Sequence, residues 1–149
     1  MSHITKIGLQ IKDLDALESA CHRLGLKLKR DQKTFKWFGR FVGDSPGIAG
    51  VNPEDYGKCD HAISVEGNTN AYEIGLVRRA DGKGYDMHWD TFCEGYGLCK
   101  AVGYDARDTA GNKLKDWYAA EVARKQMRQQ GFRVKLTQQN RKVQVLCRK

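Results

Sequence analysis

The fold is decided by residues 61–90, which read HAISVEGNTN AYEIGLVRRA DGKGYDMHWD. Strand signals occur in three runs, at residues 61–66, 72–76 and 85–89, and the last two alternate apolar with other side chains. A period of two is typical of β-strands that bury one face. Gly, Asn and Asp stand between the runs and tolerate the positive φ of tight turns. The stretch therefore predicts three antiparallel strands joined by short turns.

The chain before this meander predicts a βαβ unit. Residues 4–11 alternate, with Ile7, Leu9 and Ile11 on one face. Asp13 is suited to cap a helix over 14–24, whose apolar residues recur at spacings of three and four before Gly25. A second extended stretch is expected to begin at residues 26–28 and to continue through 35–42.

The chain after the meander predicts a long helix and a hairpin. Residues 113–130 contain neither Gly nor Pro, and Gly131 stands where a helix commonly ends. Alternation resumes at Phe132 and again at Val143, on either side of a polar turn. The order βαβ–meander–αββ predicts an α+β fold, an antiparallel sheet with two helices on one face. A ferredoxin-like core is one economical version of it.

Length and composition set the class of protein. The 149 residues suit one domain, 1–149, and 40% hydrophobic with 30% charged residues is typical of a folded globular chain. No apolar run approaches the roughly 20 residues that cross a bilayer, and the amino terminus lacks the apolar core of a signal peptide. Five scattered cysteines favour the cytoplasm or an equivalent reducing compartment. Both prolines and four glycines fall in residues 43–60, which predict a long surface loop.

The excess positive charge is concentrated in the last quarter of the chain. Residues 111–149 carry 11 Lys or Arg against Asp116 and Glu121, a balance of +9, whereas the whole chain is +8. A one-sided field of this kind attracts polyanions or an acidic partner. The segment 111–149 is therefore predicted to be a basic helix and hairpin that binds such a partner.

Eight residues of this segment are the candidate polyanion-binding set: Lys113, Trp117, Arg124, Arg128, Arg133, Lys135, Arg141 and Lys142. On the helix, cations flank Trp117, so the stripe could meet phosphates while the indole stacks on a base. The alternative is an ordinary solvated helix face, with Trp117 covering the edge of the core.

A second basic stretch is interleaved with aromatic residues, and its candidate residues are Lys27, Lys29, Arg30, Lys33, Lys36 and Arg40. If both stretches share one face, they make a patch of the size that nucleic acid needs. The alternative is an edge strand whose lysines prevent aggregation with other strands.

Thiols and imidazoles gather in the meander and raise the question of a zinc site. The residues concerned are Cys59, His61, His88, Cys93 and Cys99. None of the usual paired-ligand spacings is present, so buried structural cysteines are the favoured interpretation, and whether the five come together stays open. No set of nucleophile, base and orienting residue can be named either. We therefore expect no enzyme activity, no metal and no cofactor.

Three segments resemble a family of small proteins known as hypothetical chloroplast reading frames, found in plastids, cyanobacteria, other bacteria and some phages. The segments are MSHITKI with QIKDLDAL at residues 1–17, YEIGLVRRADG at 72–82 followed by Tyr85 and Asp90, and QQGF at 129–132. Residues 41–60 and 91–111 depart from that pattern. The resemblance implies one intact domain. The family is of unknown function, so it implies no activity and transfers no catalytic residue.

Three functions remain open at this point. The first is a non-catalytic protein that binds nucleic acid or another polyanion through the basic helix and hairpin. The second is an adaptor or inhibitor that docks on an acidic protein surface. The third is a small nucleotide binder that captures its ligand between the meander and the 43–60 loop. None of the three requires a membrane.

Overall fold

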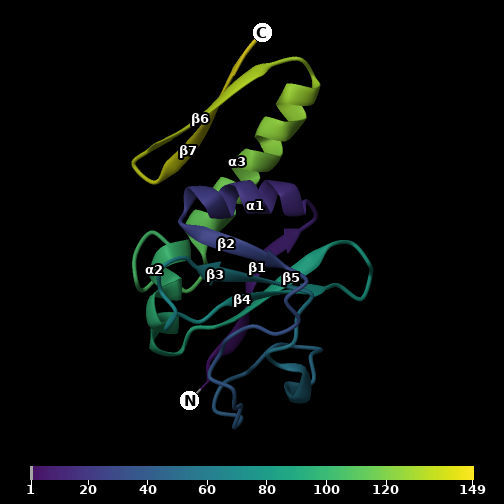
Figure 1. Ribbon diagram of the computed structural model, residues 1–149, viewed down its shortest axis with the longest axis vertical. Helices are drawn as coiled ribbons and strands as arrows, with labels where there is room; N and C mark the ends of the chain where they lie inside the picture. Colours follow the sequence, from purple (N-terminus) through teal and green to yellow (C-terminus); the bar gives the residue numbers. More distant parts are fainter. Residues whose placement is uncertain (1) are drawn as a thin grey trace.

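The computed structural model, which describes residues 2–149, confirms an α+β protein built on an antiparallel sheet (Figure 1). The five strands of this sheet are β1 (Ile4–Ile11), β2 (Leu26–Arg30), β3 (His61–Val65), β4 (Ile74–Arg78) and β5 (Tyr85–Asp90). The three α-helices are α1 (Leu14–Arg23), α2 (Leu98–Val102) and α3 (Asn112–Gln129). A separate two-stranded sheet consists of β6 (Arg133–Gln139) and β7 (Lys142–Arg148).

The order of strands in the main sheet is β1-β5-β4-β3-β2. The meander predicted from residues 61–90 forms its centre, with Ala62 opposite Gly75 and Gly75 opposite His88. The outer strands β1 and β2 lie at opposite edges, and α1 connects them across one face. The ferredoxin-like version of the fold is not confirmed, since three strands separate β1 from β2.

The helices pack on one face of the sheet and close the larger core. Met87 and Trp89 of β5 are fully buried there, together with Leu17 of α1 and Leu114 of α3. Burial of each such side chain contributes about 1.5–3 kcal/mol. Asp13 caps α1 as expected, because its Oδ1 accepts a hydrogen bond of 3.0 Å from the backbone N–H of Ala16. Within residues 2–149, no helix combines the length and the apolar character that a membrane span requires.

The opposite face of the sheet is covered by the coil between β2 and β3. The predicted continuation of a strand through residues 35–42 is wrong: β2 ends at Arg30, and Asp31 turns the chain with a φ of +64°. The coil then carries Phe35, Ile48 and Tyr56, each at most 7% exposed, into a second core. The segment 43–60 thus lacks strands but supplies buried side chains, with one turn of 3-10 helix at Pro53–Asp55.

Residues 91–111 contain α2 and a left-handed turn. Cys93, Glu94, Gly95 and Tyr96 all have φ between 50° and 61°. Left-handed backbone costs a non-glycine residue roughly 1–2 kcal/mol, so other contacts must hold this turn. The carbonyl of Gly95 accepts a hydrogen bond of 2.9 Å from the backbone N–H of Tyr72, which ties the turn to the start of β4.

The second core depends on the absence of a side chain at Gly75. A Cβ at that position would lie 2.2 Å from Cδ1 of Phe35, so the ring packs directly on the backbone of β4. Gly75→Ala is expected to displace Phe35 and to lower the free energy of unfolding by about 1–3 kcal/mol. Urea unfolding measures the change. The control is Gly8→Ala on β1, where no atom lies within 4 Å, and an equal loss in both variants would contradict this account.

Candidate polyanion-binding surface

The hairpin β6–β7 packs on α3 through one side only. Val134 and Leu136 occupy alternate positions on β6, as do Val143 and Val145 on β7. These four side chains are partly buried, and Leu136 and Val143 also contact the larger core. Because successive residues of a strand point to opposite sides, the side chains at the positions between these four face away from α3.

We call this outward side the ribbon face. It consists of four pairs of residues that lie opposite each other: Arg133 and Arg148, Lys135 and Leu146, Thr137 and Gln144, Gln139 and Lys142. Thr137 is partly buried and the other seven are exposed. The ribbon face therefore presents four cations around a short uncharged centre.

The turn of the hairpin adds a further cation. Asn140 and Arg141 both have positive φ, 50° and 63°, which is the geometry of a two-residue type I′ turn. The guanidinium of Arg141 lies 5.4 Å from the ring centroid of Tyr104, whose hydroxyl oxygen is 2.9 Å from the Arg141 carbonyl oxygen. Burial, followed by a hydrogen bond to the Asp116 carboxylate, raises the pKa of Tyr104 to about 12. The phenol therefore stays a neutral donor at physiological pH.

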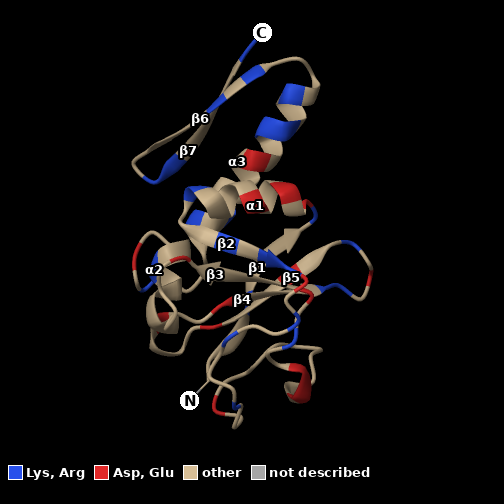
Figure 2. Ribbon diagram, viewed as in Figure 1, with Lys and Arg blue, Asp and Glu red and all other residues tan. Residues whose placement is uncertain are grey.

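The cations of the ribbon face have no acidic partner in the part of the chain that the structure describes. Residues 122–149 contain nine Lys or Arg and neither Asp nor Glu. Ion pairs within 4.0 Å occur in this stretch only at Arg124 and Lys125, both on α3. Figure 2 shows blue segments along the hairpin and the last turns of α3, with no red among them. The positive field of the predicted segment is thus concentrated at one end of the molecule.

Two of the predicted binding residues on α3 make contacts within the protein instead of facing a partner. Trp117 is 7% exposed, and the guanidinium of Arg23 covers its ring at 4.8 Å, so a base cannot stack on it. Arg124 lies 3.5 Å from the carboxylate of the buried Glu121, which also binds Arg23 at 2.7 Å. Arg128 and Lys113 have no ion pair within the described residues; Arg128 is exposed at the end of α3, and Lys113 is partly buried at its start.

The second basic stretch does not extend this surface. Lys29 pairs with Glu73 at 3.4 Å, Lys33 with Asp31 at 4.0 Å, and Arg30 with two acidic residues of α1. Lys36 donates to a backbone carbonyl, while Lys27 and Arg40 are exposed. In Figure 2, α1 lies between β2 and the hairpin, so the two basic stretches do not form one continuous face.

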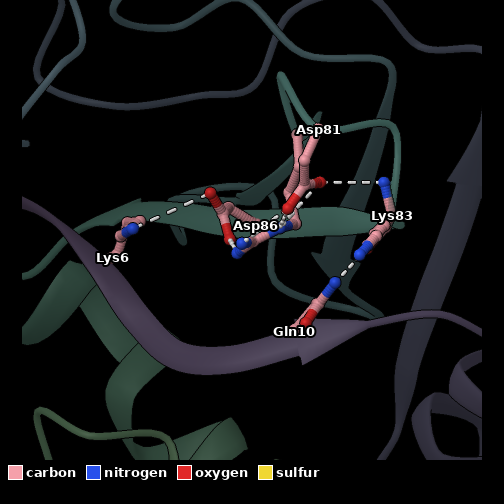
Figure 3. A network of polar contacts seen from close by, with 6 residues as sticks. Lys6, Gln10, Asp81, Lys83 and Asp86 are labelled. Atoms are coloured by element: carbon pink, nitrogen blue, oxygen red, sulfur yellow. Dashed lines mark hydrogen bonds and ion pairs between the residues drawn. The ribbon is translucent and has the colours of Figure 1, made fainter.

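Two cations at the β4–β5 turn, Lys6 and Arg79, are likewise paired with carboxylates. Figure 3 shows Lys6 next to Asp86, at 3.7 Å, and the backbone N–H of Lys83 donating to Asp81 at 2.8 Å. Arg79 joins the two carboxylates, at 3.1 Å from Asp81 and 2.9 Å from Asp86. Gln10 donates to the carbonyl of Lys83 and fastens the turn to β1. This network holds the turn against β1 and pairs both carboxylates of the turn with cations.

Sequence reasoning identified three of the eight residues of the ribbon face, Arg133, Lys135 and Lys142, and missed the other five. Arg148 lies opposite Arg133, and Thr137, Gln144 and Leu146 occupy its middle. The alternation of Val143 with Val145 already indicates that residues 142, 144, 146 and 148 share the other side. The missing information was the position of the turn, which sets the register between the two strands.

The thiols and imidazoles do not form a metal site. Across residues 2–149, no three His, Cys, Asp or Glu side chains gather as a metal ion requires. His61 Nδ1 accepts from the backbone N–H of Asp31 at 2.9 Å. The Cys59 thiol donates to the Gln32 carbonyl at 3.1 Å, and burial raises its pKa to about 12. Burial also raises the pKa of Cys99, to about 11, so both thiols stay protonated and unreactive near neutral pH.

Comparison with protein-family models, with curated proteins and with solved structures finds no match to this chain. The resemblance to the chloroplast reading-frame family stays a prediction.

His88 makes stability depend on pH. It is 3% exposed, and burial lowers its pKa from 6.5 to about 4, against a smaller opposite effect of Asp86. The unfolded chain therefore binds the proton more readily, and stability should fall by about 1–3 kcal/mol as the pH drops from 6.5 to 4. His88→Leu, which suits the neighbouring Cys59 and Val77, should flatten this dependence in urea unfolding at a series of pH values.

The control is His22→Gln on the exposed side of α1. An unchanged pH dependence in His88→Leu would show that other groups titrate.

Proposed function

We propose that this protein binds nucleic acid, without catalysis, through the ribbon face of β6–β7. The supporting observation is that four cations share this face while no carboxylate of the described residues lies within 4.0 Å of them. Arg141 at the turn of the hairpin and the exposed Arg128 in the last turn of α3 add further cations to this segment.

The arrangement has a cost in the absence of a partner. Arg133 and Arg148 stand directly opposite each other, and like charges in that position destabilise a strand pair by roughly 0.2–1 kcal/mol. The negative charge of a phosphate group near both arginines would relieve this repulsion. Each phosphate that is neutralised also releases condensed counterions, which favours binding further. The same charges that destabilise the free hairpin would therefore stabilise its complex with nucleic acid.

The other functions have weaker support. The third possibility, a nucleotide site beneath the 43–60 segment, would use a pocket of about 390 Å³ lined by Lys58, Asp55 and Asp60. Lys58 already pairs with Asp55 at 3.0 Å, so the lining is negative and repels phosphate. The second possibility, an acidic protein surface, shares the ribbon face and is separated by the experiment that follows.

The double variant Lys135→Gln with Lys142→Gln tests the proposal. Binding to a duplex should weaken, and the slope of log K against log salt concentration should become shallower by about 2, since each phosphate contact contributes about 0.9. Fluorescence anisotropy of labelled DNA between about 50 and 200 mM salt measures both quantities.

Lys29→Gln with Lys33→Gln is the matched control, since it removes the same charge from lysines that already pair with carboxylates. It should leave the slope unchanged. Equal effects in the two double variants, or tighter binding to polyglutamate than to DNA, would overturn the proposal.

A further inference from the structure

The ribbon face carries an uncharged centre between charged ends. Thr137 and Gln144 lie opposite each other, with Oγ1 and Oε1 3.5 Å apart. Leu146 is 49% exposed next to them. Lys135, opposite Leu146, and the pair of Arg133 and Arg148 carry the charge on one side of this centre, and Lys142 carries it on the other. Attraction of polyanions requires only positive charge, so it does not explain the uncharged side chains in the middle of the ribbon face.

These side chains match the chemistry of base edges. A glutamine amide can donate and accept together, which suits the N6 and N7 atoms of adenine, and threonine can bond to several bases. An exposed apolar side chain such as Leu146 suits the methyl group of thymine. Cations at both ends suit the phosphates that border a groove.

The dimensions of the hairpin match one groove in particular. Each strand has seven residues, and at about 3.4 Å per residue the hairpin is about 24 Å long. The two strands are about 4.8 Å apart, and a ribbon of this width enters the major groove of B-form DNA, which is about 12 Å wide. The major groove of A-form RNA is too deep and narrow to be read in this way.

The hairpin is also free to approach a duplex. It lies at one end of the molecule, beside α3 and away from the main sheet (Figure 1). The ribbon face contains no aromatic residue, and Trp117 is buried beneath α1, so the stacking that single strands require is missing from this surface.

We infer that the ribbon face inserts into the major groove of double-stranded B-form DNA. Thr137, Gln144 and Leu146 contact base edges there, and the cations at the two ends contact phosphates on either side. This inference rests on the proposed function and names its substrate class.

The experiment compares three ligands of one mixed sequence, about 20 nucleotides long, with the full chain: duplex DNA, duplex RNA and single-stranded DNA. Anisotropy at constant salt should show duplex DNA bound about tenfold or more tightly than the other two. Equal binding of the three would overturn the inference and leave the proposed function standing. Absence of binding to all three at low salt would overturn both.

A second measurement tests the base contacts. In selection from a random duplex library, the wild-type protein should enrich a short motif, and Gln144→Ala should reduce its preference for that motif by about tenfold with the salt slope unchanged. Gln126→Ala, on the exposed side of α3, is the control and should keep the preference. Circular dichroism checks that both variants are folded. No enriched motif, or the same loss in both variants, would overturn the role of Gln144.

Discussion

The docking of α3 on the corner between β1 and α1 determines where the charged hairpin stands. Tyr118 of α3 accepts hydrogen bonds from the backbone N–H groups of Lys12 and Asp13, at 3.0 and 3.2 Å. Lys125 of α3 donates to Asp13 at 2.9 Å, and this hydrogen bond lowers the pKa of the aspartate. Asp13 is also the residue that caps α1. One aspartate therefore joins the start of one helix to the side of the other.

Helix α3 is covered on one side by α1 and the sheet and on another by the hairpin, and this explains where its apolar residues lie. One side carries Leu114 and Tyr118 toward α1 and the sheet, and another carries Ala120 toward the hairpin. Glu121, 5% exposed, binds cations from both helices, Arg23 at 2.7 Å and Arg124 at 3.5 Å. Removing one member of such a group leaves the others desolvated and unpaired, which is strongly destabilising even where the intact group adds little net stability.

Much of the fold follows from local patterns, and the errors come from contacts between distant residues. Alternation and capping were sufficient for β1, α1, β5, α3 and the terminal hairpin, because their core faces repeat with the period of the element. They were insufficient for Phe35, which packs on Gly75 forty residues later, and therefore for the coil that covers the second face. The left-handed turn at Cys93–Tyr96 is stabilised by the distant Tyr72, so no local signal marks it.

The binding surface illustrates the difference between counting charges and locating free ones. In the sequence, Arg124 and Lys135 contribute equally to the basic segment. In the structure, Arg124 compensates a buried carboxylate, whereas Lys135 stands opposite the exposed Leu146 with no acid among the described residues near it. A cation that is already paired has little to gain from a phosphate, because the new contact replaces an existing one. The hairpin therefore dominates the attraction of a polyanion, and α3 acts mainly as its support.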